Sequence, residues 1–256
     1  MAAVRVSELP AGSAGASGRR VRAYTLSGGR GMSMTVLDLG ATVASVTMPS
    51  ATACDGEEVT LCDVALGATT DAAPPGTDPA AVHPAAGAYC GVTVGRYANR
   101  IAAGVFHLDG VRHALAATFR GQHSHGGVVG WHAAVWRVVD FGVRDSGRQA
   151  FVELTHVSPA GDEGYPGTVT AAATYWLSCA GEVGMRFRAV VAGAATPINL
   201  CNHCYWNLSG GLTRDVRDHT LRLLADTVVD VDPVTQIPLP GAAALRPVAD
   251  TAFDFR

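Results

Sequence analysis

Apolar and polar residues alternate with a period of two along most of this 256-residue chain, and convincing helical periodicity is nearly absent. Successive side chains of a β-strand point to opposite faces, so this alternation predicts short strands. The predicted strands are residues 33–39, 41–48, 58–66, 133–143, 149–157, 168–177 and 182–191, a strand at 91–101 that runs into a polar turn, and two strands within 218–231 that meet at Asp226. Many short strands with frequent turn residues favour an all-β fold, either a β-sandwich or a related large antiparallel assembly.

Glycine, proline and polar residues mark the connections between these strands. Residues 104–114 predict a hairpin, because Asp109-Gly110 is a favoured bend. Residues 71–88, rich in alanine, proline and glycine, predict a long surface connection, and residues 119–130 predict a loop rich in glycine and histidine. We find no repeat of fixed period and no linker that clearly divides the chain, so we expect a single domain.

The stretch 197–210 holds the densest group of candidate functional residues, and we expect it to be an extended interior strand. On such a strand one face carries Cys201, His203, Tyr205 and Asn207, and the other carries Asn202, Cys204, Trp206 and Leu208. A histidine between polar neighbours on a buried strand is a candidate for proton transfer near neutral pH. The alternative is a structural histidine whose ring is hydrogen-bonded inside the core.

Composition narrows the classes of partner and compartment. The 19 basic and 22 acidic residues give a formal net charge of -3, so we expect no nucleic-acid partner. Every apolar run is interrupted before it reaches the length of a membrane span, so we expect no membrane partner either. The six cysteines are scattered through a chain large enough to fold without disulfides, which favours reduced thiols in a cytoplasmic protein.

The N-terminus sets the expected domain boundary. Residues 1–22 lack the apolar core of a secretory signal, and their alanine, serine and glycine content favours a poorly ordered leader. We therefore expect a leader at 1–22 and one β-sandwich domain at 23–256.

Three further groups of residues are candidates for chemistry. Asn99-Arg100 offers several N–H donors and an amide acceptor to a hydroxyl-rich ligand, and the alternative is a solvated surface turn. In His123-Ser124-His125-Gly126-Gly127 the two glycines favour a sharply bent loop that aims an imidazole. The carboxylates of Asp162-Glu163 precede a Gly/Pro turn and fit a solvated hairpin tip.

The same residues offer little to a metal ion. His123 and His125 share a face if they lie on a strand, but helical zinc pairs are set four apart, so metal binding stays a minor alternative. Cys201 and Cys204 have CxxC spacing, yet on a regular strand their sulfurs point to opposite faces and cannot bind one ion. We expect no metal and no cofactor.

Taken together, and in their order along the chain, these stretches resemble the aldose 1-epimerase (galactose mutarotase) family. The matching segments are Gly95-Arg96-Tyr97-Ala98-Asn99-Arg100-Ile101 with Gly104-Val105-Phe106 behind it, His123-Ser124-His125-Gly126-Gly127, Asp162-Glu163-Gly164-Tyr165-Pro166-Gly167, Asn199-Leu200-Cys201-Asn202-His203-Cys204-Tyr205-Trp206-Asn207-Leu208 and Phe253-Asp254-Phe255-Arg256. The resemblance implies a β-supersandwich in which large antiparallel sheets form an open sugar-binding cleft.

The resemblance also implies roles for individual residues. The catalytic residues that it implies are His203 and His125, and the substrate-binding residues are Asn99, Arg100, His125, Tyr205 and Asp254. His203 matches the general acid, and His125 matches a histidine that binds substrate near the ring oxygen. Cys204 and Trp206 stand where the family more often has Ser and Phe. The segment from Asp162 to Gly167 is a family marker to which we assign no chemistry.

The implied reaction interconverts the α and β anomers of free hexoses such as galactose and glucose. A base removes the C1 hydroxyl proton and an acid protonates the ring oxygen; the ring opens, the C1–C2 bond rotates and the roles reverse on closure. His203 supplies the acid, helped by His125. Directional polar contacts from Asn99, Arg100 and Asp254 hold the sugar between the proton-transfer groups.

One part of the family pattern has no match in this sequence. The family's general base is a Glu on a strand beyond the segment that matches Phe253-Asp254-Phe255-Arg256, and this sequence ends at Arg256. Glu163 and Glu182 belong to other segments. We therefore expect a fold that is incomplete at its C-terminus, with exposed apolar strand edges, poor solubility and weak or no mutarotase activity.

Two other functions stay open. A catalytically impaired, truncated sugar-binding relative would keep the cleft without the general-base Glu. A hexose-6-phosphate 1-epimerase would need an extra basic cluster for the phosphate, and the sequence shows only scattered arginines. In each case the expected partner is a small sugar, and we expect the protein to be a monomer.

Overall fold

The computed structural model describes residues 1–8, 20–50, 61–66, 89–210 and 215–256. Within these ranges the regular structure consists of β-strands and short 3-10 helices, so the prediction of an all-β fold is confirmed. None of the described helices is long and apolar enough to cross a membrane.

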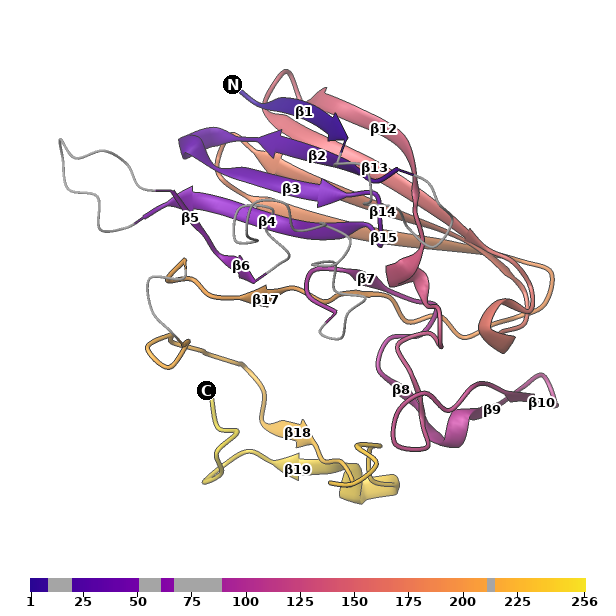
Figure 1. Cartoon of the computed structure of the whole chain (residues 1–256). Helices are drawn as coiled ribbons and strands as arrows, with labels where there is room; N and C mark the ends of the chain where they lie inside the picture. The colour runs from indigo at the N-terminus through magenta and orange to yellow at the C-terminus, as the bar shows by residue number, and fades with distance from the viewer. Residues whose placement is uncertain (9–19, 51–60, 67–88, 211–214) are drawn as a thin grey trace.

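Two antiparallel sheets lie face to face in the upper part of Figure 1. The first contains, in order of pairing, β1 (Ala3–Glu8), β2 (Arg22–Ser27), β3 (Ser33–Leu37), β4 (Thr42–Pro49) and β5 (Leu61–Asp63). The second contains β12 (Arg137–Arg144), β13 (Gln149–Ser158), β14 (Thr168–Ser178) and β15 (Val183–Ala192). In both sheets each strand pairs with its neighbour in the sequence, which is the topology of a meander.

Alternate residues of both sheets point into one shared core. On β14 the fully buried side chains are Val169, Ala171, Ala173, Tyr175 and Leu177, and from the first sheet Leu26, Met34, Val36 and Val43 are equally buried in the same cluster. Burial of one large apolar side chain contributes about 1.5–3 kcal/mol. A one-residue slip would turn the apolar set of a strand toward solvent, so this burial fixes the register of the sheets.

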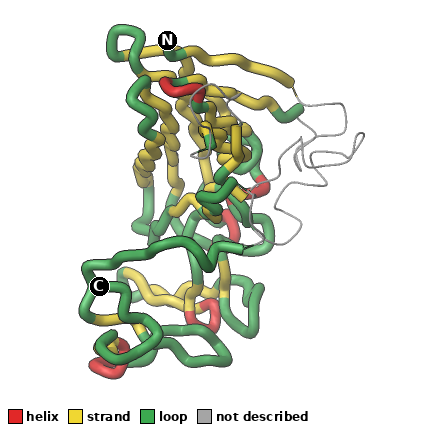
Figure 2. The backbone as a smooth tube through the Cα atoms, turned by 90° about the vertical axis from the view of Figure 1, so that its left-hand side faces the viewer, coloured by secondary structure: helices red, strands yellow, loops and turns green. Residues whose placement is uncertain are grey.

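Shorter strand pairs lie below the two sheets in Figure 1 and carry the candidate site residues. The pairs are β6 (Ala65–Leu66) with β17 (Tyr205–Trp206), β7 (Thr93–Val94) with β16 (Cys201–Asn202), β8 (Arg100–Ile101) with β11 (His123–Ser124), β9 (Val105–Leu108) with β10 (Val111–Ala114), and β18 (Thr227–Val229) with β19 (Leu245–Pro247). The 3-10 helices are η1 (Gly29–Gly31), η3 (Ala102–Gly104), η4 (Trp131–Ala133), η5 (Asp162–Gly164) and η6 (Gly241–Ala244). The view in Figure 2 shows this lower region as mostly loop beneath the strands.

Most of the predicted strands of the two large sheets are confirmed. The predictions at 33–39, 41–48, 133–143, 149–157, 168–177 and 182–191 correspond to β3, β4, β12, β13, β14 and β15. The predicted hairpin is β9–β10, and its bend residues Asp109 and Gly110 have φ of 52° and 76°, as a tight two-residue turn requires. The predicted connection at 71–88 and residues 58–60 of a predicted strand lie outside the described residues.

The prediction of a continuous interior strand over 197–210 is wrong. The segment divides into β16 and β17, and the side-chain oxygen of Asn202 accepts a hydrogen bond from the Cys204 amide at 3.1 Å. Such a local side-chain bond competes with a strand ladder, which accounts for the break at His203 and Cys204. Tyr205 and Trp206 are 45% and 42% exposed, so the second half is not interior.

Two further expectations differ from the structure. Residues 3–8, expected to belong to a leader, form β1, because Val4 and Val6 alternate with polar residues and pair with β2. Within 218–231 only Thr227–Val229 is a strand, and its partner is β19 rather than a neighbour before Asp226. The Leu223 amide donates to the carbonyl of Phe255 at 2.6 Å, so this stretch bonds to the last residues of the chain rather than to a ladder.

Candidate active site

A pocket of about 420 Å³ gathers residues that are far apart in the sequence. The described residues that line it are Tyr89, Arg100, Thr118, Phe119, Ser124, His125, His203 and Tyr205. They come from β8, β11, β17, the connections next to these strands and, for Tyr89, the connection that precedes β7. Four of the residues implied by the family resemblance therefore lie together: His203, His125, Arg100 and Tyr205.

His203 lies on the link between β16 and β17, and its backbone is fixed on both sides. Its carbonyl accepts from the Gly91 amide at 3.0 Å, and its own amide donates to Val92 O at 2.9 Å. Its ring lies 5.1 Å from that of Tyr205 and 5.3 Å from that of His125, measured between ring centroids. Two imidazoles at this spacing can contact one small ligand together.

Cys204 packs against the main core, whereas His203 lines the pocket. Cys201 packs against a separate small cluster that contains Val92 and Val94. The two cysteines therefore pack against different clusters. The described cysteines are free thiols, and burial raises the pKa of Cys204 to about 12, which keeps it protonated.

His125 is held in a left-handed backbone conformation, with φ of 50°. Its amide donates to the carbonyl of Asn99 at 2.9 Å, and the Asn99 amide donates to its Nδ1 at 3.4 Å. Because Nδ1 accepts a hydrogen bond, the neutral ring carries its proton on Nε2. Burial, followed by the positive charges of His203, Arg100 and His132, lowers the pKa of His125 to about 4. At neutral pH this ring is an uncharged N–H donor.

Glycine next to His125 allows the backbone to approach the neighbouring strand. A Cβ on Gly126 would lie 1.9 Å from the carbonyl oxygen of Gly95, and its φ of 86° disfavours any other residue. The predicted bend of this loop is thus confirmed, and its cause is the close approach of two backbones.

Arg100 closes one side of the pocket. Its guanidinium lies 4.9 Å from the centroid of the Phe119 ring, and it donates to the side-chain oxygens of Asn99 and Gln236. Its buried Nε has no partner among the described residues. A guanidinium has five N–H groups and these two bonds use two of them, so the terminal nitrogens of Arg100 keep N–H groups for a ligand. Asn99 is exposed and does not line the pocket; it supports both Arg100 and His125.

The described ion pair of Asp254 is with a neighbour in the sequence. Its carboxylate pairs with Arg256 at 2.7 Å, and that hydrogen bond holds the pKa of Asp254 below its usual range. It is not among the described residues that line the pocket. The resemblance placed Asp254 on the sugar, and the contacts described for it are instead made within the last residues of the chain.

His123 is a structural histidine. It is fully buried, its Nδ1 donates to Ala116 O at 2.8 Å, and its Nε2 accepts from the Tyr165 hydroxyl at 2.7 Å. Both ring nitrogens are thus occupied. Within the described residues no group of three His, Cys, Asp or Glu side chains is arranged to hold a metal ion.

Tyr89, Phe119 and Gln236 are site residues that the sequence analysis missed. The Tyr89 ring lies 4.6 Å from His125, 4.8 Å from His132 and 6.0 Å from His203. Tyr89 follows residues 71–88, whose composition predicts only a surface connection, and Gln236 is 136 residues from Arg100. Only Phe119 carried a local signal, because it begins the glycine- and histidine-rich loop at 119–130.

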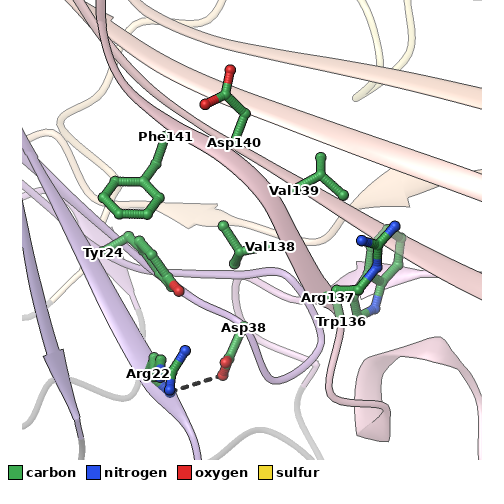
Figure 3. Close-up of a pocket in the computed structure, with 9 residues that line it drawn as sticks. All are labelled: Arg22, Tyr24, Asp38, Trp136, Arg137, Val138, Val139, Asp140 and Phe141. Atoms are coloured by element: carbon green, nitrogen blue, oxygen red, sulfur yellow. Dashed lines mark hydrogen bonds between the residues drawn. The ribbon is translucent and has the colours of Figure 1, made fainter.

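A second pocket, of about 310 Å³, lies between β2 and β12 (Figure 3). Its described lining residues are Arg22, Tyr24, Asp38, Trp136, Arg137, Val138, Val139, Asp140 and Phe141. The Arg22 amide donates to Asp38 at 2.9 Å, and Tyr24 packs edge-on against Phe141. It contains no histidine among these residues and none of the residues implied by the family resemblance, so the histidine pocket is the better candidate for acid/base chemistry.

Comparison with known proteins agrees with the resemblance. A family model described as aldose 1-epimerase matches residues 22–256. Galactose mutarotase of Homo sapiens is 41% identical over 170 residues, 66% of this chain and 45% of that protein. Aldose 1-epimerase of Escherichia coli (strain K12) is 34% identical over 239 residues, 93% of this chain and 61% of that protein. The matched region thus spans between about half and two thirds of these relatives.

Solved structures give the same result. The crystal structure of galactose 1-epimerase from Lactobacillus acidophilus NCFM superposes with a TM-score of 0.74 and 26% identity, covering 99% of this chain and 65% of that one. An aldose epimerase homologue from C. elegans has a TM-score of 0.71 and 31% identity, covering 89% of this chain and 61% of that one. These likenesses confirm the expected galactose mutarotase-like fold. The chain belongs to the aldose 1-epimerase family.

Proposed function

We propose that this chain forms the sugar site of an aldose 1-epimerase, an isomerase that interconverts the α and β anomers of free hexoses such as galactose and glucose. One observation supports this most directly: His203 and His125 lie 5.3 Å apart in a pocket of about 420 Å³ that also contains Arg100. A pocket of this size suits one hexose.

In this proposal His203 is the general acid. It gives its proton to the ring oxygen while the C1–O bond of the ring breaks and the electrons of the C1 hydroxyl form the carbonyl. His125, uncharged at neutral pH, donates a hydrogen bond from Nε2 to the same oxygen and stabilises its developing negative charge. Arg100 and Tyr205 hold the sugar hydroxyls by directional bonds.

The C1 hydroxyl proton needs an acceptor. No carboxylate is among the described residues that line the pocket, and the resemblance assigns this role to a Glu beyond the segment Phe253–Arg256. We therefore expect anomer exchange to need a proton acceptor other than the described residues that line the pocket.

Binding and exchange are best measured side by side, by calorimetry with galactose and by polarimetry of freshly dissolved α-galactose. We expect His203→Asn to lower any anomer exchange by about 100-fold or more, because general acid catalysis typically contributes this much. His107→Asn, at an exposed position on β9, is the control and keeps the wild-type rate. Failure of the wild type to bind any aldohexose would refute the proposal.

A second candidate, a hexose-6-phosphate 1-epimerase, is favoured by one observation. Arg120 lies 5.0 Å from the Phe119 ring centroid, so two guanidiniums flank this ring at the pocket. Paired cations of this kind suit a phosphate. Binding of glucose 6-phosphate at least tenfold tighter than that of glucose would select this function, and binding of galactose without any exchange would select a sugar-binding relative.

The proposal also covers the ligand, the oligomeric state and the cellular compartment of the protein. A single small sugar is the expected ligand, and the chain is expected to act as a monomer. The free thiols of the described cysteines support a cytoplasmic location.

A further inference from the structure

The carboxylate of Glu163 contacts the loop that presents His125. Its Oε2 accepts a hydrogen bond from the Val128 amide and its Oε1 accepts one from the Val129 amide, both at 2.8 Å. Two consecutive backbone N–H groups thus bind the two oxygens of one carboxylate. Hydrogen bonds to an ionised acceptor are shorter and stronger than neutral ones. The sequence analysis expected a solvated hairpin tip here, and that expectation is wrong for Glu163.

The backbone of the loop is adapted to this carboxylate. A Cβ on Gly127 would lie 2.0 Å from Oε2 of Glu163, and Gly127 has φ of 121°, which other residues rarely adopt. From the other side the loop is held by the bond of the His125 amide to Asn99 O. The loop is therefore fixed between Asn99, which precedes β8, and the carboxylate of Glu163.

Glu163 is itself held rigidly by the turn to which it belongs. The guanidinium of Arg96, only 1% exposed, donates to the carbonyl oxygens of Pro166 at 2.7 Å and Gly167 at 3.0 Å. It also donates to Oγ of Ser158 at 2.6 Å, and that hydroxyl donates to Asp162. A buried cation thus fixes both ends of the turn that carries Glu163.

We propose that Glu163 is a positioning residue that holds His125 in its pocket conformation by bonding the amides of Val128 and Val129. This inference rests on the proposed function, because it assigns His125 to the sugar. Glu163 acts through the backbone rather than through charge. Burial lowers the pKa of His123 and of His132, and the charge of Glu163 only opposes that shift, whereas burial and neighbouring cations lower the pKa of His125.

The test uses the full chain as wild type, Glu163→Ala, Glu163→Gln and a control, Glu182→Ala. Glu182 is an exposed carboxylate at the β14–β15 turn, where Ser178 Oγ lies 3.4 Å away. Three quantities are measured: hydrogen exchange of the Val128 and Val129 amides, the pKa of His125 from its ring NMR signals, and the Kd for galactose.

For Glu163→Ala we expect about tenfold faster exchange of both amides and about tenfold weaker galactose binding, the factor that corresponds to loss of one strong hydrogen bond. The pKa of His125 rises from about 4 toward its ordinary value, because a loosened loop exposes the ring. The values for Glu163→Gln lie between those of the wild type and Glu163→Ala, since a carboxamide offers one acceptor oxygen and turns its NH₂ toward the other amide. Glu182→Ala matches the wild type in all three.

Unchanged exchange at Val128 and Val129 in Glu163→Ala would overturn the proposal. So would faster exchange with the His125 pKa and the galactose Kd both unchanged, because Glu163 would then stabilise the loop without positioning the imidazole. If Glu163→Ala does not fold, Glu163→Gln carries the same comparison. If the wild type binds no galactose, the proposed function fails, and exchange together with the His125 pKa still decides whether Glu163 positions His125.

Discussion

Arg96→Lys should destabilise the fold more than any surface substitution, because a lysine cannot reproduce the donors of the buried guanidinium. The two terminal nitrogens of Arg96 approach six acceptors: Pro166 O, Gly167 O, Thr196 Oγ1, Ser158 O, Ser158 Oγ and Pro159 O. Their four hydrogens make at most four strong bonds, and a single ammonium reaches one side of the cluster.

The expected loss follows from this count. About two hydrogen bonds disappear and leave buried carbonyl oxygens without donors, at about 1–2 kcal/mol each, so the free energy of unfolding falls by about 2–4 kcal/mol. With a urea m-value of about 3 kcal/mol/M, the unfolding midpoint shifts down by about 1 M.

Urea unfolding followed by fluorescence measures this shift, with Arg188→Lys on the exposed face of β15 as the matched control. The control should change stability by no more than about 0.5 kcal/mol. An Arg96→Lys variant as stable as this control would refute the interpretation of Arg96 as the clamp of the turn from Ser158 to Gly167.

The remaining predictions concern the hydrogen bond between His123 and Tyr165 and the dependence of stability on pH. Among the described residues, the Tyr165 hydroxyl alone bonds Nε2 of the fully buried His123, and Tyr165→Phe removes it. We expect the free energy of unfolding, measured by urea titration, to fall by about 1–3 kcal/mol. No loss would show that this nitrogen finds another donor. The pKa of His125 is lowered in the folded state, so the unfolded chain binds more protons between its ordinary pKa of 6.5 and about 4, and stability must fall as the pH decreases through that window. His125→Gln should flatten this part of the stability–pH curve, and an unchanged curve would contradict the assigned burial.

The large sheets were predictable because their signal is local. Buried and exposed residues alternate on β14 with the period of a strand, and Asp109-Gly110 supplies the positive φ of a hairpin turn within two residues. The same period was expected to set the sides of the chain on which His203 and Cys204 lie. What failed was the continuity of the strand around them, because the bond from Asn202 to the Cys204 amide acts against the ladder.

The candidate site was predictable only in part, because it is built from long-range contacts. The motifs around His125 and His203 identified two of its walls. Tyr89, which packs against both rings, and Gln236, which bonds Arg100 from 136 residues away, have no local pattern. The turn at Glu163 was recognised as a family marker, yet its contact with Val128 and Val129 depends on how two distant loops meet in the fold.

A titration of the chain with galactose, followed through the ring signals of its histidines by NMR, tests the central claim most directly. We predict that the signals of His125 and His203 shift together with one Kd, while the signals of the exposed His107 and the buried His123 stay in place. A saturable shift confined to other histidines, or none at any galactose concentration, would contradict the claim that the two imidazoles share one sugar-binding pocket.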